Sequence, residues 1–290
     1  MTAKPAPTVR RDKKRPDLWP HLVLMPVTAL VLFPVLLVLR KALAPGQGFQ
    51  TELNPFEGGW TLDHFRDVVS AKTPEGEWLF GPQLWNSLIV SGVTTVVGVG
   101  LATTAAYAFS RFRFVGRNGG MTLFLVTQMF PGILMLIPTY VILNSLGLLD
   151  SLLGLALVYS TTSIPFSVWM LKGYFDTIPK ELEESAVMDG ASRLTIFVRI
   201  ILPLAAPAIA VTALFSFMTA WNEFVLAFTF VNDPLAQTLP VTIQRYADPK
   251  STLWGSFAAA SVIVSIPVMA LFYALQKYLV GGLTAGSVKG

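Results

Sequence analysis

The chain has 290 residues, of which 53% are hydrophobic and only 13% are charged, and its mean hydropathy is +0.60. Soluble domains usually carry about 25% charged residues, so this composition indicates a protein that lies largely in lipid. The chain has no cysteine and only two histidines, His21 and His64. This excludes disulfides, thiol catalysis, cysteine-bound metals and a histidine-rich metal site.

Six stretches of 21 or more residues contain no Asp, Glu, Lys or Arg: 18–39, 78–110, 118–149, 151–171, 200–222 and 251–276. A helix of about 20 residues crosses the roughly 30 Å hydrocarbon layer of a membrane. We therefore expect an all-α integral membrane protein with six transmembrane helices, at about 18–39, 84–110, 118–142, 152–172, 204–230 and 253–278. A five-span alternative requires one helix far too long, whereas the turn residues at 144–151 favour a tight helical hairpin.

Basic residues predict the orientation. With the N-terminus in the cytoplasm, 15 of the 21 Lys and Arg residues fall in cytoplasmic segments and six fall outside. By the positive-inside rule both termini are then cytoplasmic, with residues 1–17 and 281–290 as tails. This placement explains the basic pI of 9.3 without nucleic acid. A cleavable signal peptide ending near Ala42-Leu43-Ala44 is the alternative, but the apolar run is too long for one, so we expect a retained first helix.

The longest cytoplasmic loop, 173–203, predicts a short helix, a glycine turn and a second short helix. Pro179 suits a helix start, and Glu181, Glu183 and Glu184 complement the positive end of the helix dipole. Gly190 is expected to end this helix, and Ser192 to begin a second one that runs to Ile201. The two helices would expose an apolar edge that a partner protein could grip.

The spacing within this loop resembles the EAA loop of membrane subunits of binding-protein-dependent ABC importers. Glu184-Ser185-Ala186 is followed by three residues, Gly190, nine residues and Ile200-Ile201-Leu202-Pro203, with Ser185 in place of the usual Ala. Asn86-Ser87, the segment 106–111 (Ala-Tyr-Ala-Phe-Ser-Arg) and Trp221-Asn222-Glu223-Phe224 resemble the carbohydrate-uptake branch. The C-terminal segment 278–290 is similar to the smaller membrane subunit of maltose and maltodextrin importers. The resemblance covers about residues 86–290.

This resemblance implies a permease subunit in a bacterial cytoplasmic (inner) membrane. It implies pairing with a second permease, an external sugar-binding protein, and a cytoplasmic ATPase dimer that holds the ATP and Mg, so no cofactor is expected on this chain. The residues implied in coupling to the ATPase are Glu184, Ser185, Ala186, Asp189, Gly190, Ile200, Leu202 and Pro203. A simpler alternative, a solvated acidic face ended by a glycine cap, remains open for Glu181 and Glu183 individually.

No catalytic residue is expected. The chain lacks a Gly-Lys-Ser or Gly-Lys-Thr sequence and therefore a Walker A phosphate loop, and it also lacks the common hydrolase and dinucleotide-binding motifs. We therefore expect a transport subunit and not an enzyme. A self-sufficient secondary transporter or channel is the alternative, although ion coupling normally uses several charges within the membrane.

Glu223 is the one acidic residue within a predicted span. At 100° per residue, Thr212, Ser216, Thr219 and Glu223 share one helix face, and we expect this face, with Asn222, to line the pathway or the seam between subunits. Phe217, Trp221, Phe224 and Phe228 fall on the opposite face, which is expected to pack on lipid or on neighbouring helices. For Glu223, a structural hydrogen bond to another helix is an equal alternative.

Overall fold

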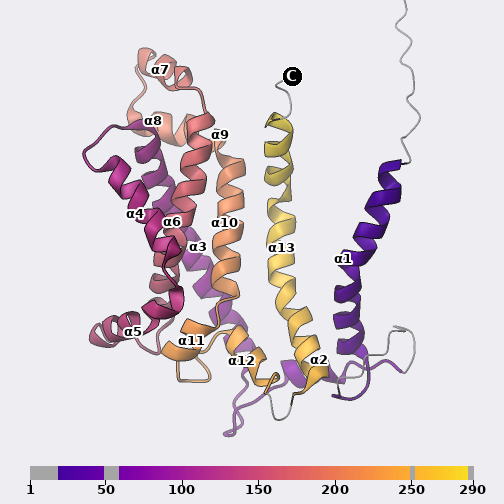
Figure 1. The fold of residues 1–290 in the computed structure, drawn as a ribbon. Coiled ribbons are helices and arrows are strands. Elements are labelled where there is room, and N and C mark those ends of the chain that lie inside the picture. The colour runs from indigo at the N-terminus through magenta and orange to yellow at the C-terminus, as the bar shows by residue number, and fades with distance from the viewer. Residues whose placement is uncertain (1–18, 49–58, 249–251, 287–290) are drawn as a thin grey trace, which may run out of the picture.

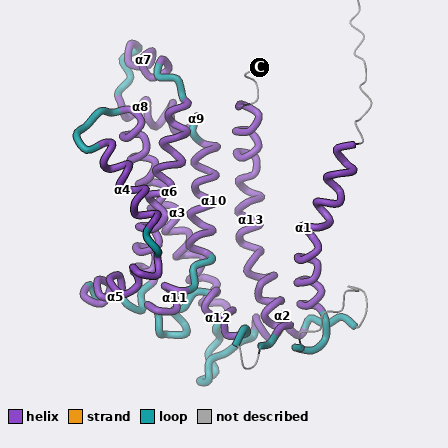
Figure 2. Tube along the Cα trace, in the orientation of Figure 1, coloured by secondary structure: helices purple, strands orange, loops and turns teal. Residues whose placement is uncertain are grey.

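The computed structural model describes residues 19–48, 59–248 and 252–286, and every regular element within these ranges is helical (Figures 1 and 2). The all-α prediction is therefore confirmed. The expected tail 1–17 and the last four residues lie outside the described ranges. The four longest helices are α1 (Trp19–Leu43), α3 (Phe80–Arg111), α6 (Leu152–Thr177) and α13 (Trp254–Gly286).

Helix α3 is the centre of the bundle. It packs most extensively on α6 and then on α10 (Ala206–Trp221). Gly98 permits this close approach, because a Cβ atom added there would lie 2.8 Å from the Ser163 hydroxyl and 3.8 Å from that of Ser216. Small residues at helix crossings allow the backbones to approach in this way within membranes.

The third predicted span is not one straight helix. Helix α4 (Arg117–Met129) is followed by a 3₁₀ turn (Gly132–Met135, η1) and α5 (Leu136–Ser145), and the two segments differ in direction by 97°. Phe130 is extended, as expected for the residue before a proline, and Pro131 has no N–H to continue the helix.

The fifth predicted span, expected as one helix from 204 to 230, is also divided. Helix α10 ends at Trp221 and a short helix α11 (Val225–Phe230) begins after a break. Before α10, the helical segment Arg193–Leu204 meets α10 at a bend of 75°. Among the described residues, four helices are by themselves long and apolar enough to cross a membrane, and the count rises to six if each bent pair forms one span.

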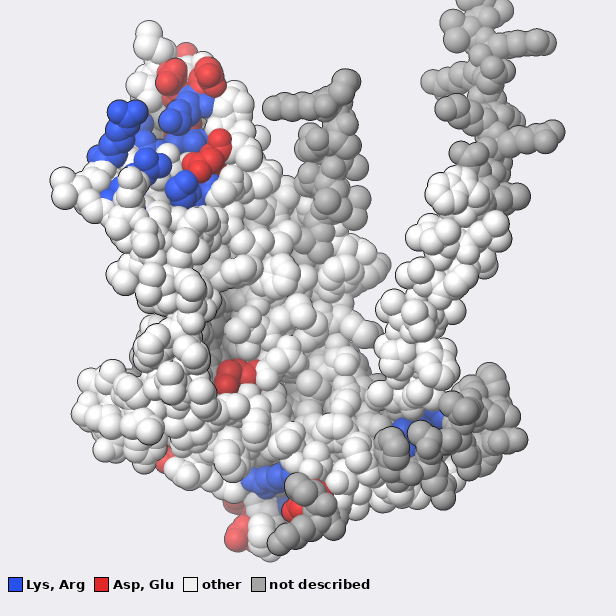
Figure 3. All heavy atoms as spheres, in the orientation of Figure 1, with Lys and Arg blue, Asp and Glu red and all other residues white. Residues whose placement is uncertain are grey.

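Charged side chains gather at the two ends of the molecule, and the belt between them is largely uncharged on the face shown, apart from one small acidic patch (Figure 3). One end carries α7 (Glu181–Met188), and the N-terminal end of α1 and the C-terminal end of α13 lie at that same end (Figure 1). The opposite end carries α2 (Asp63–Val69), α5, α11 and α12 (Leu239–Arg245). Helix α13 continues to Gly286, so residues 281–286 of the expected tail are helical.

Helix α1 stands apart from the bundle and meets α13 and α2 through a small cluster that includes Ala42, Val68 and Ala259. Leu22, Met25 and other large apolar side chains along it are exposed. Lipid or another subunit must cover such a surface.

We predict that Gly98→Leu destabilises the protein, because the larger side chain would force α3 away from α6 and α10, and overpacking of this kind typically costs about 1–3 kcal/mol. The matched control is Gly100→Leu on the same helix, since no atom lies within 4 Å of its added Cβ. The measurement is the temperature at which the purified protein loses its monodisperse peak in detergent. Equal midpoints for the two variants would contradict this packing.

Candidate functional site

The predicted helix, turn and helix are present in the loop after α6. Helix α6 ends at Thr177, and Ile178 is extended before Pro179. Helix α7 ends in a Schellman motif, in which Gly190 N–H donates to Val187 O (3.0 Å) and Ala191 N–H to Ala186 O (2.9 Å). Gly190 has φ +85°, the left-handed conformation that glycine adopts without strain.

The second half of the loop begins as expected at Ser192, whose hydroxyl accepts the Thr195 N–H (3.2 Å) as an N-cap. The second helix was expected to end at Ile201 but extends to Leu204. It consists of α8 (Arg193–Ile196), a π-helical turn (Phe197–Ile201, η2) and α9 (Leu202–Leu204). Ile196 and Ile201 are fully buried in a cluster of apolar residues that also includes Phe175. These apolar contacts hold the loop against α3 and α6.

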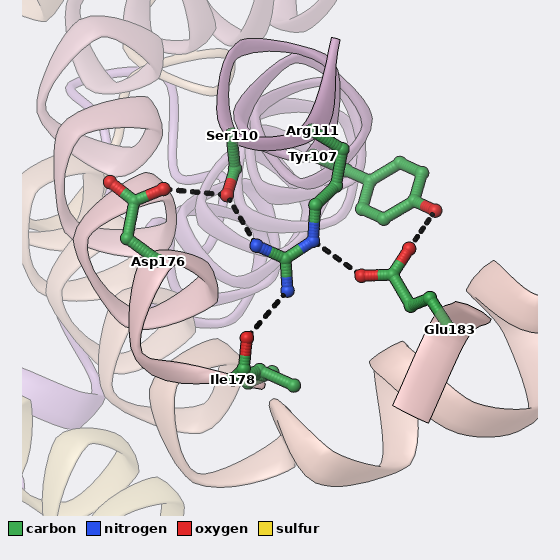
Figure 4. Close-up of polar contacts among 6 residues, drawn as sticks. All are labelled: Tyr107, Ser110, Arg111, Asp176, Ile178 and Glu183. Atoms are coloured by element: carbon green, nitrogen blue, oxygen red, sulfur yellow. Dashed lines mark hydrogen bonds and ion pairs between the residues drawn. The ribbon is translucent and has the colours of Figure 1, made fainter. Parts of the chain in front are cut away.

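A buried ion pair fixes α7 to the end of α3 (Figure 4). Arg111 Nε donates to Glu183 Oε1, and the two side chains are only 5% and 7% exposed. Tyr107 donates its hydroxyl hydrogen to the other carboxylate oxygen of Glu183 (2.8 Å). The ring of Tyr107 also packs 4.8 Å from that of Phe197, between ring centroids, so it contacts both halves of the loop.

The same arginine reaches the end of α6. Its Nη2 donates to Ile178 O (3.0 Å) and its Nη1 to the Ser110 hydroxyl (3.1 Å), which in turn donates to Asp176 (2.6 Å). Lys172 pairs with the other oxygen of Asp176 at 2.6 Å. Because Arg111 binds groups from α6 and α7 at once, the ends of three helices are held as one unit.

The same unit also carries exposed apolar side chains. Met188 is 87% exposed and Leu194 71%, and Leu182, Val187 and Val198 are also exposed. The acidic side chains of Glu184 and Asp189 stand beside them. An apolar surface rimmed by charge at the tip of a membrane protein is typical of a protein docking surface.

The expected coupling residues divide into two groups. Those exposed at the tip are Glu184, Ser185, Asp189 and Gly190, together with Pro203. Ala186, Ile200 and Leu202 are partly buried, and the first two pack against the same cluster as Ile196.

The solvated-face alternative for Glu183 is wrong, because Arg111 and Tyr107 enclose its carboxylate. Sequence reasoning missed both partners, although they lie within the segment 106–111.

Glu223 makes structural contacts at the break between α10 and α11. Its carboxylate accepts the Tyr159 hydroxyl (2.7 Å) from α6 and the backbone N–H groups of Leu226 (2.9 Å) and Ala227 (3.1 Å). The carboxylate therefore satisfies N–H groups that the interrupted helix leaves without partners. This geometry favours the structural alternative for Glu223.

The other candidate pathway residues do not form one site. Ser216 and Thr219 line a pocket with α4 and α6, whereas Asn222 lines a different pocket with α12 and α13. Thr212 is fully buried. On the aromatic face, Phe217 and Trp221 are buried, and Trp221 donates its indole N–H to Val264 O (3.2 Å) of α13, so these two rings pack on a neighbouring helix.

Comparisons with known proteins agree with this architecture. The chain is 35% identical to the maltodextrin transport system permease protein MdxG of Bacillus subtilis, over 93% of this chain and 95% of that protein. It is 36% identical to the maltose/maltodextrin transport system permease protein MalG of Escherichia coli K12, with the same coverage. A chain of a bacterial ABC transporter involved in import of the acidic polysaccharide alginate has a similar fold, with TM-score 0.72, 22% identity and coverage of 94% of this chain and 99% of that chain.

Residues 95–284 match the model of the family described as binding-protein-dependent transport system inner membrane component. This range contains both the Arg111–Glu183 ion pair that joins α3 to α7 and the exposed apolar side chains of the loop, such as Met188. Together with the identity to MdxG and MalG over nearly the whole chain, this match shows that the protein belongs to that family of ABC importer permeases.

Proposed function

We propose that this chain is one permease subunit of an ATP-driven importer for a neutral sugar, with maltose or maltodextrin as the substrate, and that α7 couples it to a cytoplasmic ATPase. The proposal rests on the observation that α7 has exposed apolar side chains, such as Met188, and is also joined to α3 by the buried ion pair of Glu183 and Arg111. The relatives named for maltodextrin and maltose transport support the choice of substrate.

The protein is a multi-pass component of a bacterial inner membrane and a transport subunit, and ATP is hydrolysed on a separate chain. We place the α7 end in the cytoplasm, with both termini on that side. The excess of Lys and Arg in the segments assigned to that side supports this orientation. A second permease, an external binding protein and the ATPase dimer complete the transporter.

Coupling follows from how α7 is held. A force applied to the exposed face of α7 passes through Glu183 and Arg111 into α3, and through Ile178 into α6. Because packed interiors deform little, movement of the ATPase against α7 would displace the ends of both long helices together. The alternative of an ion-coupled transporter depends on Glu223. Its carboxylate already accepts hydrogen bonds from the Tyr159 hydroxyl and from backbone N–H groups, which favours a structural role over ion coupling.

We predict that Met188→Glu weakens binding of the ATPase, because it places a charge at the most exposed of these apolar side chains. Loss of a central interface side chain typically costs about 2 kcal/mol or more, which is about thirtyfold in affinity. The measurement is recovery of the ATPase with the tagged chain from native membranes, followed by sugar-stimulated ATP hydrolysis. Val115→Glu is the control, because Val115 is fully exposed in the loop after α3 but lies outside α7. Equal loss in both variants would contradict docking on α7.

We predict that Arg111→Met is more damaging than the double substitution Arg111→Met with Glu183→Leu. The single change leaves a buried carboxylate without its cation, at a cost of about 3–5 kcal/mol, whereas an apolar pair of similar volume avoids that cost. Thermal stability in detergent should follow this order.

In the double variant, the apolar contacts of Ile196 and Ile201 remain, so the ATPase should still bind. Sugar transport per ATP hydrolysed should fall, because the charge-assisted bonds that join α7 to α3 and α6 are gone. Uptake and hydrolysis are measured together on the reconstituted complex. A double variant with wild-type transport per ATP would show that the ion pair serves folding alone.

A further inference from the structure

A basic pocket lies where the chain passes from α3 to α4, and its volume is about 340 Å³. The side chains that line it include those of Arg113, Phe114, Arg117 and Asn118. Helix α3 is long and apolar enough to cross a membrane, so its last residue, Arg111, lies near the membrane surface. The loop projects sideways from the bundle at the level of α8, short of α7 (Figure 1). The pocket therefore lies where lipid headgroups surround the protein.

Contacts with Phe109 hold this loop in place. Arg117 Nε donates to Phe109 O (2.7 Å), and the ring of Phe114 packs on the ring of Phe109 with centroids 5.3 Å apart. Gly116 makes the turn into α4 with φ +88°, a conformation that glycine adopts without strain. The pocket is thus a part of the fold that packing and hydrogen bonding keep in shape.

The guanidinium groups of this pocket are not neutralised by acidic side chains. Within the described residues Arg113 and Arg117 form no ion pair, and the hydrogen bond of Arg117 uses Nε alone. A third guanidinium, that of Arg193 on α8, lies 6.0 Å from the ring centroid of Phe112. The segment 78–149 contains no Asp or Glu, and basic side chains gather at this end of the molecule (Figure 3). Guanidinium groups with free N–H donors are well suited to bind phosphate.

Apolar side chains flank these arginines and are exposed. Val115 is fully exposed, and the rings of Phe112 and Phe114 are 40% and 45% exposed. A soluble anion such as inorganic phosphate cannot cover these side chains, whereas a phospholipid carries acyl chains next to its phosphate. Basic and aromatic residues together are typical of the headgroup level of a membrane. The combination favours a lipid over a soluble anion.

We propose that this pocket binds the headgroup of an anionic phospholipid such as phosphatidylglycerol. Arg113 and Arg117 hold the phosphate, and Phe114 and Val115 lie against the acyl chains. The volume is at the low end of the range of about 300–1,000 Å³ that ligand pockets span, which fits a phosphate with a small polyol. Because the loop directly follows Arg111, a bound lipid would fix the end of α3 and the start of α4 to the membrane surface.

The test uses the assembled transporter in lipid nanodiscs that contain photoactivatable phosphatidylglycerol or photoactivatable phosphatidylcholine at the same mole fraction. After illumination this chain is isolated, and its modified residues are located by mass spectrometry. The anionic lipid should label residues 112–119 at least tenfold more than the neutral lipid, because each basic residue near a membrane surface raises the affinity for anionic lipid about fivefold. Equal labelling by the two lipids would overturn the proposal.

Two double variants of equal charge separate the pocket from the general surface charge. Arg113→Gln combined with Arg117→Gln should remove most of the excess labelling by phosphatidylglycerol. Lys180→Gln combined with Arg199→Gln is the matched control, because these exposed residues lie at the same end of the molecule but do not line the pocket. This control should keep the excess. Equal losses in the two double variants would show that surface charge alone attracts the lipid.

A further variant keeps every charge and the hydrogen bond of Arg117. Gly119 lines the pocket, and a Cβ atom added there would have no atom within 4 Å. Gly119→Leu should therefore fold normally and occupy part of the space that the headgroup needs. We expect it to lower the excess labelling at least threefold, and an unchanged excess would contradict binding in the pocket.

Two other results would assign the arginines to a different ligand. If millimolar inorganic phosphate at constant ionic strength abolished the excess labelling, the pocket would be a site for a soluble anion. If Arg113→Gln with Arg117→Gln lowered recovery of the ATPase and left lipid labelling at the wild-type level, these arginines would belong to the ATPase interface. Either result would overturn the lipid site.

Discussion

The buried pair of Arg111 and Glu183 is the constraint on which the cytoplasmic end of the molecule depends. Removing two charges from water costs several kcal/mol for each ion unless the pair is well aligned and its remaining bonding positions are filled. Here the Tyr107 hydroxyl donates a hydrogen bond to the second carboxylate oxygen of Glu183. The Ser110 hydroxyl oxygen and Ile178 O accept hydrogen bonds from the two other nitrogens of the guanidinium group. Any movement of α7 alone would break several of these bonds at once, so α7 can move only together with the ends of α3 and α6.

This constraint explains why one face of α7 can stay apolar and exposed. A helix of eight residues has little stability of its own and usually depends on packing. The anchor through Glu183 and the apolar contacts of Ala186 and Ile196 hold α7 from one side. Met188 and Leu182 are therefore not needed for folding of the loop and remain available to a partner.

The parts of the loop that depend on neighbours in sequence could be predicted, and those that depend on distant residues could not. The helix end at Gly190 and the cap at Ser192 follow from local backbone chemistry, and both are present. The burial of Glu183, next to the exposed Glu184, requires Arg111 from another helix, and nothing in the loop sequence distinguishes the two glutamates. The role of Glu223 as a cap could not be predicted for a similar reason, because it depends on a helix break that periodicity assumes to be absent.

The two helix breaks also determine where polar groups can lie within the membrane. Interrupted backbone is tolerated at that depth only where protein covers it or where it lines a cavity. Gln128 comes just before the break at Pro131, and Thr219 just before the break that Glu223 caps, and both side chains line the pocket beside α6. The breaks thus end α4 and α10 beside the same pocket, which side chains of α6 also line.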